Sequence, residues 1–330
     1  MKKIDFMKKT FLAALALSAL ACLCGCGKRS AKTVNIGMFP NVTHAQGVIA
    51  YQLSKEGRGW FEKYLPKDCK IEWTSFNAGP SAINSIFSGD IDLTYVGPNP
   101  AINGYIKSDG KSVRILAGSA DGGAGLLVNP KLGIKKPQDF KGKIIGTPQI
   151  ANTQDVACRA WLIANGLKIN EGAGGDVEIL PTKNPQQLPL FKRGDMDAAW
   201  TVEPWVSRLE AQAGAKMFYF EPDAVTTIFV ARTNFLHEKP ELAMALLQAH
   251  KDLTKWINEN PKEAQELVRR GIKNITGADF PPELIASAWK RINFTPNLNR
   301  AGIEKFVDDS ISCGFISKKM DMNPLFFKFE

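Results

Sequence analysis

Apolar and polar positions along most of the chain follow two alternating patterns. Apolar runs with the length of strands cover residues 34–38, 70–76, 91–96, 143–146, 177–180 and 196–201. Segments with helical spacing of apolar residues lie between them, at 45–53, 81–87, 152–165 and 186–191. Strands that alternate with helices form parallel sheets with crossover helices, so the pattern predicts an α/β fold.

One stretch of this pattern occurs twice. Residues 80–92 align without gaps with residues 185–197 at an offset of 105, and in both copies a proline precedes the helix and a glycine ends it before an Asp-x-Asp sequence. Residues 36–46 match residues 145–154 at offsets of 109 and 108. Either match alone is also explained by turn residues that are common in α/β proteins. Together they predict two lobes built on one plan.

The loops between these strands and helices are the expected ligand site. Open α/β sheets bind ligands at the carboxyl ends of parallel strands, where helix starts offer N–H groups without intrahelical partners. The loops 40–46, 77–81 and 149–154 contain no acidic side chain, which favours an anion. The candidate ligand-binding residues are Asn41, Thr43, His44, Asn77, Gly79, Ser81, Asn99, Gln149, Asn152, Thr153, Trp200 and Glu203. An alternative is that Thr43, Ser81 and Asn152 only cap helices.

Aromatic residues and one carboxylate complicate the choice of ligand. Tyr95, Trp200 and Trp205 follow corresponding strands of the two lobes, where they either enclose an organic body or belong to the core. Glu203 would repel an anion unless its carboxylate meets an ammonium group or is paired inside the protein, and we favour internal pairing.

The amino terminus has the pattern of an export signal. Four lysines within the first nine residues precede an apolar run at 11–20 that is too short to span a bilayer. The sequence Leu-Cys-Gly-Cys at 23–26 predicts a signal peptide of residues 1–25, a lipidated Cys26 and a tether of residues 26–32. A plain secretory signal is the alternative, and either Met1 or Met7 is the start. We therefore expect a protein of the periplasm or cell surface, anchored to a membrane by its N-terminal lipid.

Composition and motifs limit the remaining functions. The formal charge of +9 falls to +6 without residues 1–25, and no basic block is present, so we expect no nucleic-acid partner. Cys69, Cys158 and Cys313 allow one disulfide at most and form no metal-binding spacing. The sequence has no Gly-x-Ser-x-Gly, phosphate-loop or His-Glu-x-x-His motif, and His44 is the one histidine in a predicted site loop. We expect no enzymatic activity, cofactor or metal.

Several segments together resemble the aliphatic-sulfonate, taurine and nitrate group of ABC-importer substrate-binding proteins. They are Asn-Ile-Gly-Met-Phe at 35–39, Asn-Ala-Gly-Pro-Ser at 77–81, Gly-Asp-Ile-Asp-Leu at 89–93, Gly-Pro-Asn-Pro at 97–100, and the segments 139–146 and 197–205. The resemblance covers about residues 33–320 and implies a type II periplasmic-binding-protein fold, with two lobes joined by two chain crossings near 119–125 and 223–227. It places residues 33–120 and 226–330 in lobe 1 and residues 121–225 in lobe 2.

The resemblance also implies a function. A monomer would capture a small oxyanion-bearing ligand, with a sulfonate-like one favoured, between its lobes and deliver it to an ABC permease and its ATPase. One alternative is a ligand-sensing lipoprotein that acts on a receptor. Another is an enzyme of the same fold similar to pyrimidine synthases, although that family is cytosolic and uses a cysteine-rich segment that this chain lacks.

Overall fold

The computed structural model describes residues 33–169, 174–317 and 319–329. The predicted signal peptide, the lipidated Cys26 and the tether lie outside the described residues. Within the described part of the chain, no helix combines the length and the apolar character that crossing a membrane requires.

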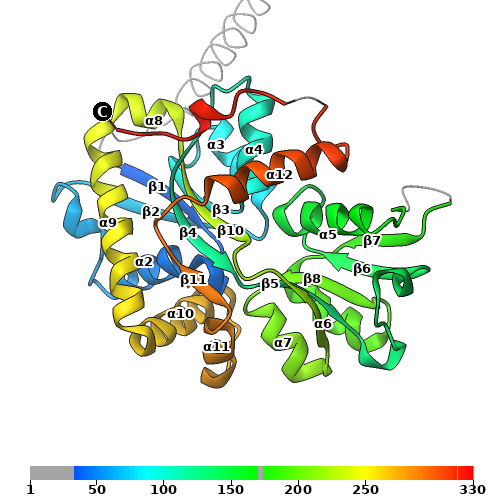
Figure 1. Ribbon diagram of the computed structural model, residues 1–330. Helices are drawn as coiled ribbons and strands as arrows, with labels where there is room; N and C mark the ends of the chain where they lie inside the picture. The colour runs from blue at the N-terminus through cyan, green and yellow to red at the C-terminus, as the bar shows by residue number, and fades with distance from the viewer. Residues whose placement is uncertain (1–32, 170–173, 318, 330) are drawn as a thin grey trace, which may run out of the picture. The chain divides into compact units, whose positions relative to one another are not determined.

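One lobe is built on a six-stranded sheet with the order β11-β4-β10-β3-β1-β2 (Figure 1). Its strands are β1 (Thr33–Met38), β2 (Lys70–Ser75), β3 (Leu93–Val96), β4 (Val113–Gly122), β10 (Val225–Arg232) and β11 (Ile292–Phe294). β1 and β3 are parallel, with Ile36 opposite Leu93, whereas β10 runs antiparallel to both β3 and β4. Its helices are α2 (Ala45–Lys55), α3 (Gly79–Phe87), α4 (Pro98–Lys107), α8 (Thr233–Glu238), α9 (Pro240–Glu259), α10 (Pro261–Thr276), α11 (Pro282–Trp289) and α12 (Arg300–Ser312), together with the 3-10 turns η2 (Val42–His44), η3 (Phe61–Tyr64) and η6 (Asn323–Leu325). We call this the first lobe.

The second lobe is built on a five-stranded sheet with the order β7-β6-β8-β5-β9. Its strands are β5 (Ala124–Val128), β6 (Lys143–Thr147), β7 (Val177–Pro181), β8 (Ala198–Val202) and β9 (Lys216–Phe220). Its helices are α5 (Thr153–Ala164), α6 (Asn184–Arg193) and α7 (Trp205–Ala213), with the 3-10 turns η4 (Pro130–Leu132) and η5 (Pro137–Phe140). β6 is parallel to both β7 and β8, as the alternation of strands and helices predicts.

The chain passes between the two sheets twice. β4 ends at Gly122 and β5 begins at Ala124, while β9 ends at Phe220 and β10 begins at Val225. The Gly122 N–H donates to Ala224 O at 2.8 Å, so the two crossings are bonded to each other. Two lobes joined by two crossings are the architecture that the resemblance implies, and the fold class is confirmed. The residue boundaries of the lobes stay a prediction.

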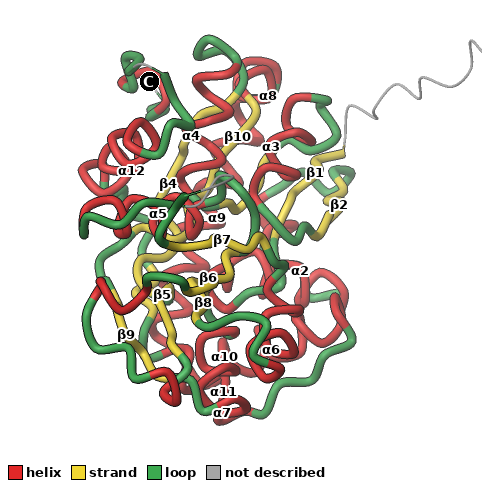
Figure 2. The backbone as a smooth tube through the Cα atoms, turned by 90° about the vertical axis from the view of Figure 1, so that its right-hand side faces the viewer, coloured by secondary structure: helices red, strands yellow, loops and turns green. Residues whose placement is uncertain are grey.

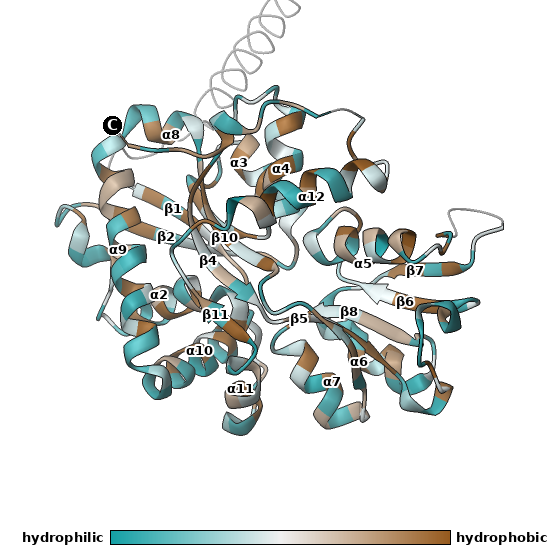
Figure 3. Cartoon of the chain, viewed as in Figure 1, coloured by the Kyte–Doolittle hydropathy of each residue, from teal (hydrophilic) through white to brown (hydrophobic). Residues whose placement is uncertain are grey.

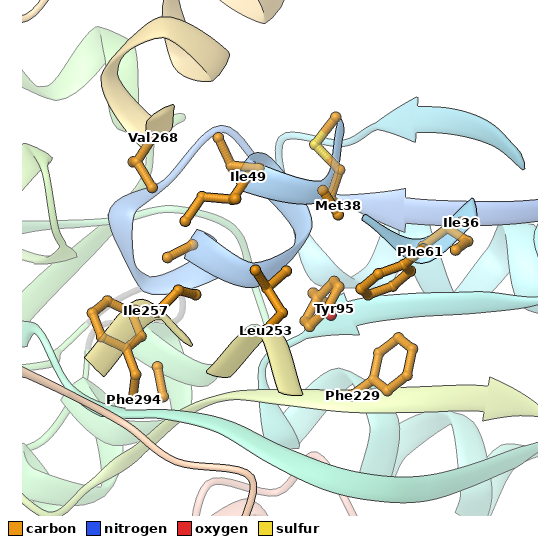
Figure 4. Packing of buried hydrophobic residues seen from close by; sticks show 14 of the residues in the cluster. Ile36, Met38, Ile49, Phe61, Tyr95, Phe229, Leu253, Ile257, Val268 and Phe294 are labelled. Carbon is orange, nitrogen blue, oxygen red and sulfur yellow. The ribbon is translucent and has the colours of Figure 1, made fainter. Parts of the chain in front are cut away.

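Apolar side chains cover both faces of the first sheet. Tyr95 and Phe229 face a cluster that includes Leu253 of α9 and Val268 of α10 (Figure 4), whereas Val96 on the neighbouring position of β3 packs on the opposite face. This alternation follows from the two-residue period of strands. Figure 3 shows the result, with strands largely in the hydrophobic colours and hydrophilic colours on the outer sides of the helices.

His250 belongs to this core and not to a reactive site. It is fully buried, its Nε2 lies 2.8 Å from Gly118 O, and its Nδ1 lies 3.0 Å from the Tyr95 hydroxyl. A carbonyl oxygen only accepts, so Nε2 carries the proton and Nδ1 accepts from Tyr95. Burial lowers the pKa of His250 to about 4, which keeps the ring neutral. The same contacts assign Tyr95 to the core.

The sequence repeat is also a structural repeat. Asp92 Oδ2 accepts from the Asn35 N–H at 3.0 Å, and Asp197 Oδ2 accepts from the Ile144 N–H at 2.9 Å. In each pair the aspartate N–H returns a bond to the other backbone, at 2.8 and 2.9 Å. Each aspartate therefore fixes the start of the strand that leads to a site loop in its own lobe.

Candidate functional site

A cavity lies where strand ends of the two lobes meet. We call it the first cavity. Its walls are Phe39, Asn41, Thr43, His44, Asn77, Ala78, Gly79, Gly97, Pro100, Pro148, Asn152, Thr153, Gln154, Asn184, Val202 and Thr226. None of these residues carries a formal charge at neutral pH when His44 is neutral. The free volume inside is about 30 Å³, which is room for about two water molecules.

Helix starts face this cavity with few side-chain caps. α3 and α4 begin after Ala78 and Gly97, and neither residue caps its helix through a side-chain hydrogen bond. η2 begins after Asn41, also without a side-chain cap, but its Val42 N–H donates to Glu203 O and its His44 N–H to Asn41 O, which leaves the Thr43 N–H. The N–H groups of a first helical turn have no acceptor inside the helix, and they carry the positive end of the helix dipole. The cavity therefore offers hydrogen-bond donors and a favourable potential to an anion, without a cationic side chain.

The start of α5 differs, because Asn152 does cap this helix. Its Oδ1 accepts from the Asp155 N–H at 2.8 Å, and Asp155 Oδ2 accepts from the Ala151 N–H at 2.8 Å. This reciprocal pair resembles a capping box. The side-chain oxygen of Asn152 therefore caps α5, as the alternative in the sequence analysis states. Thr43 and Ser81 do not occupy cap positions.

Two buried polar atoms in the cavity wall have no hydrogen-bond partner within the protein. They are Nδ1 of His44 and Oγ1 of Thr153, in residues that are 5% and 3% exposed. Burial lowers the pKa of His44 to about 3, so this ring is neutral at physiological pH. Buried polar atoms are nearly always paired, because an unpaired one costs about 1–3 kcal/mol. Two of them in one small cavity indicate a polar ligand.

The two lobes are in close contact across the first cavity. A Cβ atom built on Gly97 of the first lobe would lie 2.1 Å from Oγ1 and 3.0 Å from Cβ of Thr153 in the second lobe. Trp205 of the second lobe donates from Nε1 to Asn41 Oδ1 of the first at 2.9 Å. The cavity is consequently enclosed by groups from both lobes.

The structure brings most of the candidate residues together. Asn41, Thr43, His44, Asn77, Gly79, Asn152 and Thr153 line the first cavity. Ser81 and Gln149 lie apart from it, in a groove between the lobes that Asn77 and Gln186 also line. Asn99 is fully buried and donates from Nδ2 to Ser310 Oγ at 2.7 Å, outside the cavity wall.

Glu203 is paired inside the protein, which is the arrangement that we favoured. Its carboxylate is fully buried and accepts from the Ser207 N–H and hydroxyl and, at 2.8 Å, from Arg291 Nη1. Burial raises the pKa of Glu203, whereas the bonds from Ser207 and Arg291 lower it, and burial has the larger effect. Arg291 also binds Glu210, so this ion-pair cluster joins the turn between α11 and β11 of the first lobe to α7 of the second.

Nine residues of the first cavity were absent from the candidate list, and four of them carry the argument here. Gln154 lies in the first turn of α5, Asn184 starts α6, Val202 ends β8 and Thr226 lies at the second crossing. The repeat offered a signal for Asn184, because it is equivalent to Gly79 at the offset of 105. Thr226 had no such signal, since its position depends on how the crossing strands pair.

The two sheets, the crossings and the cavity between them define a periplasmic-binding-protein fold. Solved structures with the same fold include the alkanesulfonate-binding protein SsuA of Xanthomonas axonopodis pv. citri bound to MOPS, with a TM-score of 0.69 and 18% identity over 87% of this chain and 95% of that one. The periplasmic nitrate-binding protein NrtA of Synechocystis PCC 6803 gives 0.70 and 16% identity over 88% and 83%. The chain belongs to the NMT1-like family, whose model matches residues 27–272.

Relatives in sequence are binding proteins. A Bacillus subtilis (strain 168) protein named for aliphatic sulfonate binding is 29% identical over 275 residues, which cover 79% of this chain and 77% of the relative. The taurine-binding periplasmic protein of Escherichia coli (strain K12) is 26% identical over 266 residues, covering 77% and 73%. The resemblance to the sulfonate, taurine and nitrate group is confirmed.

Proposed function

We propose that this protein is the extracytoplasmic solute-binding component of an ABC importer, and that it captures a small oxyanion-bearing ligand in the first cavity. The observation that carries the proposal is the combination of uncapped helix starts with two buried, unpaired polar atoms, Nδ1 of His44 and Oγ1 of Thr153. The names of the relatives support the assignment, because they bind taurine, nitrate or sulfonates.

The proposed ligand group is a sulfonate-like oxyanion. Its oxygens accept from first-turn N–H groups of both lobes and from Thr153, and the absence of acidic side chains in the cavity wall avoids repulsion. Proline at residues 80, 98 and 100 removes some of these N–H groups, so the starts of α3 and α5 contribute more donors than the start of α4.

Capture follows from contacts that only the closed form makes. A ligand held by donors of both lobes binds the closed arrangement more tightly than an open one, and it therefore shifts the population towards closure. The closed protein then presents a surface of both lobes to a permease. The proposed partners are this permease and its ATPase, and the protein acts as a monomer.

Isothermal titration calorimetry tests the ligand class. Methanesulfonate, taurine, sulfate and nitrate are titrated into the purified protein in a buffer without sulfonate, and saturable binding of at least one is expected. Thr153→Val keeps the shape of the side chain but removes the hydroxyl, and we expect a loss of affinity of at least fivefold. Thr233→Val is the matched control, because Thr233 Oγ1 is also buried and unpaired but lies on α8, outside the cavity wall. Equal effects of both variants would refute the proposed site.

The lipid anchor is a separate part of the proposal. Cys26 is expected to carry the lipid, so the protein should fractionate with membranes and the Cys26→Ser variant should be released in soluble form. Mass spectrometry of the mature N-terminal peptide provides the direct measurement. A mature chain that starts at another residue, or that lacks lipid, would contradict the anchor and leave the ligand site untouched.

A further inference from the structure

A second, larger cavity adjoins the first. It lies between α5 of the second lobe and α12 of the first, which are neighbours in both Figure 1 and Figure 2. Thr153, Gln154 and Thr226 line both cavities, so the two spaces meet at the start of α5. The free volume of this second cavity is about 480 Å³, compared with about 30 Å³ in the first cavity.

The walls of this second cavity are largely apolar. Small side chains on one face of α5, at Ala157, Ala160 and Ala164, leave room that larger residues would fill. No charged residue of α5 lines this cavity, and an aromatic cluster forms another part of its wall. Trp161, Trp200 and Tyr219 pack together with ring centroids 5.6–6.3 Å apart and present one aromatic wall.

The rim of the second cavity has an excess of negative charge. Glu221, Asp223 and Asp309 line it together with one basic residue, Lys305, which binds Asp309 at 2.8 Å. No basic side chain of the described residues is within salt-bridge distance of Glu221 or Asp223, although Glu221 interacts with Lys305 and Tyr219 at longer range. Burial and, to a smaller extent, the Asp223 carboxylate raise the pKa of the nearby Asp121 to about 6.

The two cavities therefore favour opposite charges. The first cavity has donors and no carboxylate, whereas the second has an aromatic wall and carboxylates, which together attract ammonium groups. A ligand whose oxyanion head occupies the first cavity can extend its carbon chain past Thr153 into the second cavity, because Thr153, with its unpaired hydroxyl oxygen, lines both.

We propose that the ligand is a zwitterion, with an oxyanion head in the first cavity and an alkylated or ring-bearing ammonium body in the second. This inference rests on the proposed function, because it names the ligand class for the same site. The ammonium group then meets Glu221 and Asp223, and not Glu203, whose carboxylate is used by Arg291.

Three ligands with the same sulfonate head separate the contributions of the head, the apolar body and the positive charge to affinity. Methanesulfonate carries the head alone, 4,4-dimethylpentane-1-sulfonate adds a neutral body, and 3-(trimethylammonio)propane-1-sulfonate has the same shape with a positive charge. Calorimetry should show the neutral body binding at least tenfold more tightly than methanesulfonate, because it leaves water for an apolar cavity. The ammonium compound should bind at least tenfold more tightly than its neutral isostere.

Two variants test where the body lies. Ala160→Leu fills the second cavity and should remove the advantage of both larger ligands while leaving methanesulfonate unchanged. Ala211→Leu, at an exposed position of α7, is its control. Glu221→Gln with Asp223→Asn should remove the preference for the ammonium compound over its isostere and nothing else. Glu178→Gln with Asp195→Asn removes the same charge from exposed positions of the second lobe and should have no effect.

The outcomes distinguish this inference from the proposed function. If methanesulfonate binds and the two larger ligands bind no more tightly, the second cavity does not hold a ligand body, and the inference fails while the function stands. If the neutral isostere binds as tightly as the ammonium compound, the zwitterion is refuted. If none of the three binds, both proposals are overturned.

Discussion

Replacing Gly97 by alanine tests closure at the point where the lobes touch. The glycine has φ −70° and ψ 158°, which alanine adopts without strain, so the substitution disturbs only what the new Cβ would meet. That atom would lie 2.1 Å from Thr153 Oγ1 and 3.0 Å from Thr153 Cβ. Rotation of the threonine moves Oγ1 but leaves the contact between the two Cβ atoms, so the lobes must separate by several tenths of an ångström or more.

The expected cost falls on the closed form alone. Inserting one methyl group into a packed contact costs about 1–3 kcal/mol, which corresponds to a loss of affinity of about 5- to 150-fold. The proposed capture mechanism requires the lobes to part in the unliganded protein, so the unfolding free energy without ligand should change by less than about 1 kcal/mol. Calorimetry measures the affinity, and thermal melting with and without ligand measures the stability. Small-angle X-ray scattering should show that ligand compacts the parent protein but not the variant.

Two results would refute this reasoning. An unchanged affinity in Gly97→Ala would show that the ligand-bound protein does not bring the two lobes together at Gly97. A large loss of stability in the absence of ligand would show that the contact belongs to the resting protein, so that closure is not coupled to capture.

Three further predictions concern stability. Arg291→Ala leaves the buried Glu203 carboxylate without its cation and should cost about 3 kcal/mol. Because Arg291 lowers the pKa of Glu203, its removal raises this pKa further, so the deficit in unfolding free energy should be larger at pH 8 than at pH 5, and an equal deficit at both would contradict the pairing. His44 and His250 are neutral in the folded protein and take up protons on unfolding below pH about 6.5, so each should lower stability by about 1.4 kcal/mol per pH unit as pH falls towards 4, and His44→Asn should reduce this slope in denaturant titrations. Asn152→Ala should lower the unfolding free energy by about 1 kcal/mol, and no change in melting would exclude its capping role.

Much of the fold was predictable because local chemistry repeats in the two lobes. Gly89 and Gly194 end equivalent helices with φ of +77° and +81°, and each is followed by an Asp-x-Asp sequence that precedes a strand. Helix ends of this kind depend on nearby residues and can be predicted from a sequence. The order of strands within each sheet, and the antiparallel insertion of β10 between β3 and β4, depends on contacts between distant segments and was not predictable in this way.

The candidate site was predictable as a set of loops and less so as a set of side chains. Loops at the carboxyl ends of parallel strands converge whatever their side chains do, so seven of the candidates line the first cavity. Ser81 lines the groove between the lobes, and Asn99 contacts Ser310, because the direction of a side chain on a helix depends on where the helix packs.

Charge pairing across the lobes was the hardest feature to predict. The partner of Glu203 is Arg291, which lies 88 positions away in sequence and belongs to the other lobe. No local pattern connects the two residues. The second cavity could not be predicted from the sequence for the same reason, because α5 and α12, which line it, lie about 150 residues apart in the chain.

A crystal structure of the protein with saturating 1-propanesulfonate is the most direct test of the central claim. The account predicts the sulfonate oxygens within hydrogen-bond distance of Thr153 Oγ1 and the His44 ring, with donors from helix starts of both lobes around them. A sulfonate bound on the surface of a single lobe, or held by lysine or arginine side chains outside the first cavity, would contradict it.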